Sequence, residues 1–82
     1  MLIGKFQKNA LEELRVTIDS FKGNEIVNIR VYYQDDHGEF NPSKKGITFV
    51  AELEKCDELI KLLQSAKREI LKREKAQAAS TN

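Results

Sequence analysis

Basic and aromatic side chains alternate through the first half of this chain. The basic residues in that half that lie near predicted strands and turns are Arg15, Lys22, Arg30, Lys44 and Lys45. The aromatic residues among them are Phe21, Tyr32, Tyr33 and Phe40. Cationic groups bind phosphates and flat rings accept unstacked bases, so the combination is typical of a surface for single-stranded nucleic acid. The pattern also fits aromatic residues in a sheet core and lysines that solubilise the surface, and both interpretations stay open at this point.

No group of residues indicates catalysis. The only histidine, His37, lies in a turn with no nucleophile paired to it, and Cys56 falls among apolar helical positions, where a free cysteine acts as a small hydrophobe. Asp35 and Asp36 precede His37, but three adjacent side chains in a turn rarely converge on one ion. Gly46 lacks the glycine-rich spacing of a phosphate-binding loop. We therefore expect neither an enzyme nor a metal or cofactor site.

Length and composition predict one small soluble domain. The chain has 82 residues, of which 40% are hydrophobic and 33% charged, and a formal net charge of +1. No apolar run approaches the roughly 18 residues of a membrane span, and the N-terminal apolar stretch is too short for a signal peptide. A single cysteine forms no internal disulfide, which favours a reducing, cytoplasmic or otherwise intracellular location without membrane contact.

Alternating hydrophobicity predicts strands in the first half. Residues 14–19 alternate apolar and polar side chains, and residues 26–34 are rich in β-branched and aromatic types. A short strand is expected over 39–41, ended by Pro42, which cannot donate to a ladder. The fourth strand is expected over 47–50. Because the connections are short, neighbouring strands should pair antiparallel.

Two further segments are less regular. Gly23 and Asn24 are expected to take the positive φ angles of a tight hairpin. Residues 1–13 are interpreted as an N-terminal extension, in which residues 2–6 are a candidate for a short extra strand and residues 12–13 for a solvated loop.

The second half has helical periodicity. Neither glycine nor proline interrupts residues 51–75, which would span roughly 38 Å as a helix. Its apolar stripe comprises Leu53, Cys56, Leu59, Ile60, Leu63, Ala66, Ile70 and Leu71. Leu62 lies off this stripe. The apolar surface is larger than one small sheet needs, which favours a homodimer. Residues 76–82 are expected to form a mobile tail.

Several short pieces follow one another in order and at near-constant spacing between Leu14 and Phe49: Phe21-Lys22-Gly23, Val27–Tyr33, Gly38-Glu39-Phe40, Pro42 and Lys44–Thr48. Through these pieces the segment, about 36 of the 82 residues, resembles the single-stranded DNA-binding domain of the positive cofactor four family of transcriptional coactivators, in its bacterial form. The resemblance implies an α+β fold of type ββββα over residues 14–75, with a curved antiparallel sheet, a long C-terminal helix and a homodimer formed through the helices.

The resemblance also implies residue roles. Phe21 and Tyr33 would stack on bases, and phosphates would meet Lys22 and Arg30 from the sheet. Lys44 and Lys45 would meet phosphates from the loop before the last strand. Arg15 joins this set as a basic strand residue. Binding would be tolerant of sequence, with single-stranded DNA, a melted duplex or RNA as the ligand, and with a role in transcription regulation or DNA metabolism.

Departures from the family pattern support an alternative. Asp19, Asn24 and Asn41 stand where some members carry cations, which should weaken binding. Arg30 and Tyr33 point to opposite faces of an ideal strand, so both can touch DNA only with a bulge or a strong twist. The alternative is a dimeric protein-interaction module of the transcription or replication machinery with little affinity for DNA.

Overall fold

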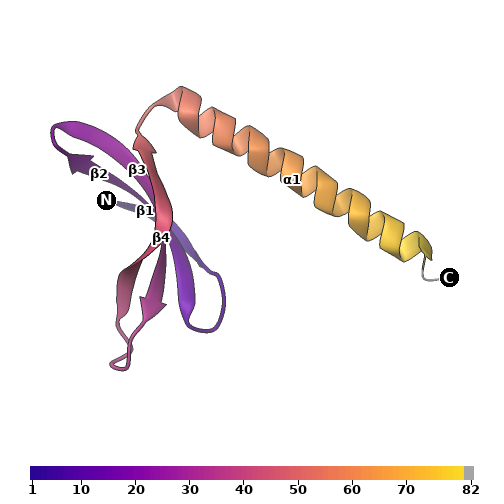
Figure 1. Cartoon of the computed structure of the whole chain (residues 1–82), viewed down its shortest axis with the longest axis horizontal. Coiled ribbons are helices and arrows are strands. Elements are labelled where there is room, and N and C mark those ends of the chain that lie inside the picture. The colour runs from indigo at the N-terminus through magenta and orange to yellow at the C-terminus, as the bar shows by residue number, and fades with distance from the viewer. Residues whose placement is uncertain (81–82) are drawn as a thin grey trace. The chain divides into compact units, whose positions relative to one another are not determined.

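The computed structural model describes residues 1–80 and contains four strands and one helix (Figure 1). The strands are β1 (Leu2–Gln7), β2 (Glu12–Phe21), β3 (Asn24–Gln34) and β4 (Phe40–Val50), and the helix is α1 (Leu53–Ser80). The chain divides into two compact units, a sheet over Met1–Ala51 and a helical segment that begins at Glu52. No helix in the described part is long and apolar enough to cross a membrane.

The sheet has the order β1-β2-β3-β4, and every neighbouring pair is antiparallel. Because strand side chains alternate, the pairing of β2 with β3 defines two faces. The apolar face is formed by the cross-strand pairs Leu14–Val31, Val16–Ile29 and Ile18–Val27. The polar face is formed by the pairs Glu13–Tyr32, Arg15–Arg30, Thr17–Asn28, Asp19–Ile26 and Phe21–Asn24. The sheet therefore separates a hydrophobic surface from a charged one.

The expected sheet of four antiparallel strands followed by a helix is confirmed, but the strands were divided wrongly. The segments 39–41 and 47–50 belong to one strand, β4, and Pro42 lies inside it. Proline is tolerated there because β4 is an edge strand, whose outward N–H groups need no partner in the sheet. The fourth strand is instead β1, within the segment 1–13.

The expected solvated loop over residues 12–13 was also wrong. Both residues belong to β2, and the Glu12 carbonyl accepts hydrogen bonds from the Lys8 and Asn9 amides at 2.9 and 3.2 Å. Asn9 Oδ1 accepts from the Leu11 and Glu12 amides, which closes the β1–β2 turn. Glu13 is buried on the polar face. The N-terminal segment thus completes the sheet on the outer side of β2.

The β2–β3 hairpin turns at two residues, Lys22 and Gly23. Their φ angles are 50° and 81°. Two successive positive φ angles are characteristic of a type I′ turn, whose twist matches that of the strands. Asn24, expected in this conformation, instead pairs with Phe21 as the first residue of β3. Lys22 therefore occupies a backbone region that non-glycine residues seldom adopt.

The helix begins two residues later and extends five residues farther than the expected span of 51–75. Residues 76–80 of the expected tail belong to α1, and residues 81–82 lie outside the described residues. Large apolar side chains of the predicted stripe are exposed in the single chain: Leu53, Ile60, Leu63, Ile70 and Leu71.

The β3–β4 loop is organised around Asp35. Its Oδ1 accepts hydrogen bonds from the His37 and Glu39 amides at 2.9 and 3.0 Å, and its Oδ2 accepts one from Asn41 Nδ2 at 2.7 Å. The Glu39 amide, and after it Asn41, hold the pKa of Asp35 below its ordinary value, because these donors favour the ionised carboxylate. The asparagine at position 41 thus fixes the loop.

The lowered pKa of Asp35 predicts a loss of stability in acid. A carboxyl group whose pKa is depressed by folding stabilises the protein above its ordinary pKa of about 4, and this contribution disappears as the pH falls through the lower folded-state value. Asp35→Asn should therefore lower the urea midpoint at pH 7, with a difference from wild type that shrinks towards pH 2.

Asp36→Asn is the control, because Asp36 is exposed in the same loop and accepts no hydrogen bond from the described residues. It should leave the midpoint unchanged at every pH. A difference between Asp35→Asn and wild type that stayed constant from pH 7 to pH 2 would contradict this role of the carboxylate.

Candidate nucleic-acid interface

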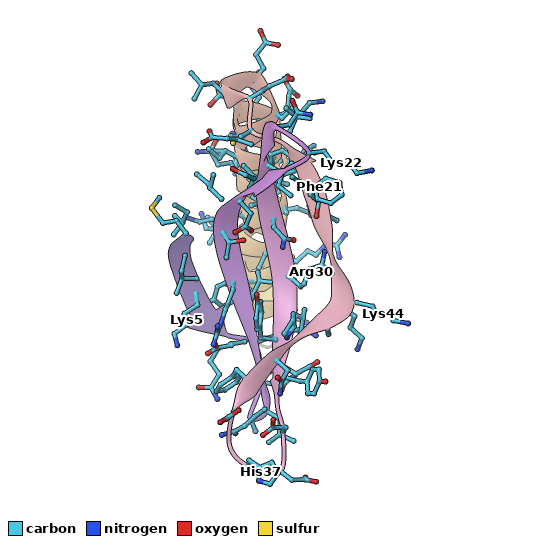
Figure 2. All side chains as sticks on the ribbon, turned by 90° about the vertical axis from the view of Figure 1, so that its left-hand side faces the viewer. Lys5, Phe21, Lys22, Arg30, His37 and Lys44 are labelled. Atoms are coloured by element: carbon cyan, nitrogen blue, oxygen red, sulfur yellow. The ribbon has the colours of Figure 1, made fainter. Side chains whose placement is uncertain are left out.

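The tip of the β2–β3 hairpin joins a ring and a cation. The Phe21 side chain is 59% exposed, and Lys22 Nζ lies 5.4 Å from the centroid of its ring. The two residues are adjacent, and the positive φ of Lys22 bends the chain directly after Phe21. Figure 2 shows both side chains at one end of the sheet. An exposed ring beside an ammonium group is suited to one stacked base and a neighbouring phosphate.

A bulge in β4 carries the two lysines. Arg30 pairs with Gly46 and Tyr32 with Pro42, so three residues of β4, 43–45, lie opposite Val31 alone. Extra residues in one strand bend it and redirect its side chains. Lys44 and Lys45 are both exposed on this bulge, and Figure 2 shows Lys44 projecting outward from the β4 edge of the sheet.

Hydrogen bonds from neighbouring groups hold the bulge. Ser43 Oγ donates to the Val31 carbonyl at 2.7 Å and accepts from the Lys45 amide at 3.1 Å. Arg30 Nη1 donates to the Ser43 carbonyl at 3.0 Å. Gly46 follows directly, and a Cβ at its position would lie 2.6 Å from the Ile29 carbonyl oxygen. The bulge is thus a fixed platform for the lysines, and Arg30 is part of its support.

Arg15 is engaged within the protein. Its Nε lies 2.6 Å from Glu13 Oε1, and its guanidinium carbon lies 4.3 Å from the Tyr32 ring centroid and 5.7 Å from that of Phe40. Lys5 Nζ adds a second cation at 3.7 Å from Glu13 Oε1. The Glu13 carboxylate balances the Arg15 charge, so Arg15 is less available to a phosphate than the exposed lysines. It orders the rings of Tyr32 and Phe40 on the polar face.

Tyr33 lies apart from these groups. It pairs with Glu12 and follows Val31 by two residues, so alternation directs its ring towards the apolar face. The β2–β3 pairing has no irregularity from Glu12 to Phe21, and the bulge in β4 leaves the alternation of β3 unchanged. The structure does not bring Tyr33 and Arg30 to one face. The stacking role of Tyr33 stays a prediction.

An acidic residue reduces the charge at the hairpin tip. Asp19 precedes Phe21 by two residues on the same face. The Thr17 hydroxyl donates to Asp19 Oδ2 at 2.6 Å and holds the pKa of that carboxyl below its ordinary value, so it is ionised at neutral pH. Asp19 Oδ1 lies 3.5 Å from the Met1 ammonium, which balances part of this negative charge.

Sequence reasoning missed Ser43 and Glu13. A glycine within a strand often marks a bulge, so Gly46 was a usable signal for the bulge that Ser43 stabilises. Glu13 contacts Arg15, two residues away on β2, and Lys5 on β1, and the pairing of β1 with β2 has no local sequence signal. Within residues 1–80, no group of three or more His, Cys, Asp or Glu side chains is placed to hold a metal ion.

The fold and part of the sequence match a known family. The sequence model of the family described as Transcriptional Coactivator p15 (PC4) matches residues 8–62. A crystal structure of a PC4 homologue from Burkholderia pseudomallei is 29% identical, with a TM-score of 0.76, over 84% of this chain and 90% of that one. A comparison with curated proteins found no match.

Two further structures are similar. One is the bacteriophage T5 homologue of the eukaryotic coactivator PC4, implicated in recombination-dependent DNA replication, with 26% identity and a TM-score of 0.66 over 96% of this chain and 91% of that one. The other is MoSub1, solved as a complex with DNA, with 26% identity and a TM-score of 0.55 over 85% of this chain and 83% of that one.

The bulge predicts that Ser43 stabilises the sheet. Ser43→Ala removes two hydrogen bonds and leaves the Val31 carbonyl without its hydroxyl donor, so the free energy of unfolding should fall by about 1 kcal/mol in urea titrations. Ser20→Ala is the control, since Ser20 is exposed in the same sheet and its hydroxyl makes no hydrogen bond with the described residues. Equal unfolding free energies for the two variants would show that the Ser43 hydroxyl does not hold the bulge.

Proposed function

Because the chain belongs to the Transcriptional Coactivator p15 (PC4) family, we propose that its sheet binds single-stranded DNA with little preference for sequence. The observation that carries the proposal is that one sheet presents both an exposed ring and exposed cations. Phe21 and Lys22 lie at the hairpin tip, and Lys44 and Lys45 lie on a bulge supported by Arg30. Phosphate contacts and stacking read no base edges, so such a surface binds most sequences.

The relatives support DNA as the ligand. MoSub1 was solved in complex with DNA, and the T5 homologue is implicated in recombination-dependent DNA replication. For this chain we propose a binding role, without catalysis, in transcription regulation or DNA metabolism. A separated strand leaves its bases free to stack on Phe21, whereas duplex bases are already stacked. Single strands, including a melted duplex, should therefore bind better than an intact duplex. Single-stranded RNA presents the same phosphates and unstacked bases, so the proposed surface would accept it as well.

We also propose that the protein is a homodimer paired through α1. The sheet contains two buried hydrophobic residues, Val27 and Val31, each 7% exposed, and no described side chain is fully buried. The stripe along α1 is exposed in the single chain. A partner helix would remove this apolar surface from water, which contributes about 25 cal/mol per Å².

A second candidate function is supported by the charge of the sheet. Residues 1–51 contain seven Lys and Arg and seven Asp and Glu, so their formal net charge is zero. A neutral surface draws nucleic acid weakly at long range and suits a protein partner from the transcription or replication machinery. The bulge lysines decide between the two functions, because only the first requires their charge to meet phosphates.

Lys44→Ala/Lys45→Ala should weaken binding to a labelled single strand of about 20 nucleotides. Each phosphate contact to a single strand releases about 0.7 counterions, so the loss of two lysines should make the slope of log affinity against log salt shallower by about 1.4. At about 0.1 M salt this change corresponds to a loss of affinity of roughly 25-fold. Fluorescence anisotropy at several salt concentrations, with matched duplex as competitor, measures both the slope and the preference for single strands.

Lys8→Ala/Lys55→Ala is the matched control, because it removes the same charge from the β1–β2 turn and from α1, outside the proposed surface. It should change the salt slope little. Wild-type protein that failed to bind the strand at low salt, or equal losses in the two double variants, would reject the sheet surface and favour the protein-interaction module.

The proposed dimer predicts different effects at two adjacent leucines. Leu63 lies on the apolar stripe and Leu62 beside it, and both are more than half exposed in the single chain. Leu63→Glu should weaken dimerisation by roughly 100-fold. Burial of one leucine side chain contributes about 1.5 kcal/mol, and a two-fold interface loses this contribution once from each copy. Leu62→Glu should remain dimeric in sedimentation equilibrium. A wild-type chain that sedimented as a monomer at high micromolar concentration would refute helix pairing.

A further inference from the structure

Charge is strongly segregated along α1. Residues 52–60 contain four acidic residues and one basic residue, whereas residues 61–75 contain six basic residues and two acidic ones. The part of the helix beyond residue 62 also lies outside the segment matched by the family. The family match therefore does not account for the basic residues of 61–75.

Four of these cations share one side of the helix. Lys61, Arg68, Lys72 and Lys75 are separated by seven, four and three residues, which is the spacing of one helical face. We name this set the basic stripe. It spans roughly 21 Å at about 1.5 Å per residue. All four residues are exposed.

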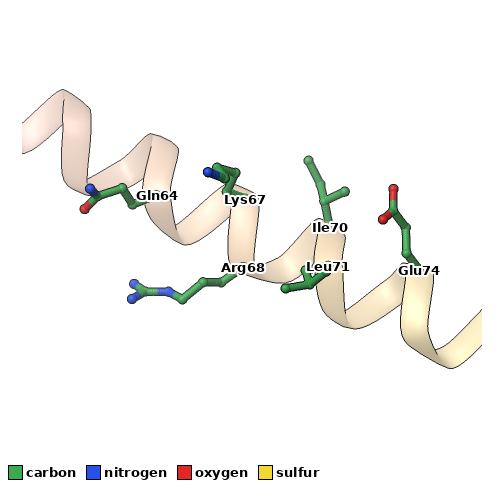
Figure 3. Close-up of a pocket in the computed structure, with 6 residues that line it drawn as sticks. All are labelled: Gln64, Lys67, Arg68, Ile70, Leu71 and Glu74. Atoms are coloured by element: carbon green, nitrogen blue, oxygen red, sulfur yellow. The ribbon is translucent and has the colours of Figure 1, made fainter.

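The basic stripe lies away from most of the apolar stripe. At about 100° per residue, Arg68 and Ile70 are separated by roughly 160° around the helix axis, whereas Leu71, at the border of the apolar stripe, is roughly 60° from Arg68. Figure 3 shows the Ile70 side chain projecting from a different side of α1 than Arg68 and Leu71. The apolar stripe is the surface proposed for dimerisation, so most of the basic stripe stays open to another ligand when the helices pair.

Helix stability does not account for the basic stripe. Cations favour a helix when they lie in its last turn, but the last turn of α1 contains no basic residue. Arg68 and Lys72 are four residues apart and Lys72 and Lys75 three apart, so like charges are neighbours, which destabilises a helix by a few tenths of a kcal/mol for each pair.

Acidic side chains neutralise little of this charge. Among the side chains that the structure describes, neither Lys72 nor Lys75 has an ion-pair partner, and Arg68 donates only to Ser65 Oγ at 3.2 Å. Lys61 Nζ lies 3.9 Å from Glu58 Oε1, and because both side chains are exposed, this pair contributes little. By contrast, Arg73, on another side of the helix, is held by Glu69 at 3.2 Å.

We propose that the basic stripe is a second binding site, for the phosphodiester backbone of nucleic acid. A row of uncompensated cations on one exposed face complements a polyanion, and phosphates would relieve the repulsion among them. Because the stripe has no aromatic ring, it contacts phosphates without accepting bases. The inference rests on the proposed function and adds contacts outside the sheet.

The test compares two double variants of the full chain. Arg68→Gln/Lys72→Gln removes two charges from the basic stripe, and Lys55→Gln/Arg73→Gln removes two from another side of the same helix. The probe is a labelled single strand of about 30 thymidines, titrated at several salt concentrations. The stripe variant should make the salt slope shallower by about 1.4 and weaken binding roughly 25-fold at about 0.1 M salt, whereas the control should change both little.

Several outcomes would overturn the inference. Equal slopes for the two variants would show that only overall charge matters. Another outcome is a stripe variant that is monomeric in sedimentation equilibrium while its salt slope for the strand equals that of wild type. That result would show that the basic stripe contacts an acidic protein surface in the dimer and not nucleic acid. If the stripe variant bound as wild type while Lys44→Ala/Lys45→Ala lost affinity, this inference would fail and the sheet surface would stand. Lys61→Gln/Lys75→Gln repeats the comparison with two other residues of the stripe.

Discussion

The pairing of β3 with its two neighbours is the constraint on which the proposed surface depends. On the side of β2 the pairing is regular, which fixes the alternation of β3 and separates its polar and apolar faces. On the side of β4 the pairing is interrupted opposite Val31, where three residues replace one. One strand thus faces a continuous ladder on one side and a bulge on the other. The regular ladder builds the sheet, and the bulge gives the lysines their exposure.

The same alternation places the small hydrophobic core of the sheet, Val27 and Val31, on the face opposite the charged one. A comparable separation occurs on α1, where the basic stripe lies away from most of the apolar stripe. On α1, self-association and ligand binding would therefore use largely different surfaces, so neither would block the other.

Periodicity and the family resemblance predicted the sheet, the helix and the exposed cations, because these depend on short-range patterns. Pro42 misled the strand assignment, since its effect depends on whether the strand is an edge, which is a property of the whole sheet. Lys22 took the backbone conformation expected at Asn24 because strand register, and not residue preference, fixed the turn. The burial of Glu13 was not predictable, because besides Arg15 on its own strand Glu13 contacts Lys5 on the neighbouring strand β1, and that pairing has no local sequence signal.

The most direct test of the central claim is to map the binding surface by amide chemical shifts while a single strand of about 20 nucleotides is added to labelled protein. We predict that the largest changes fall on Phe21–Gly23 and on the bulge from Ser43 to Gly46. Changes confined to the apolar-face residues Leu14, Val16 and Ile18, or no changes at low salt, would contradict the assignment of the polar face and its bulge as the nucleic-acid surface.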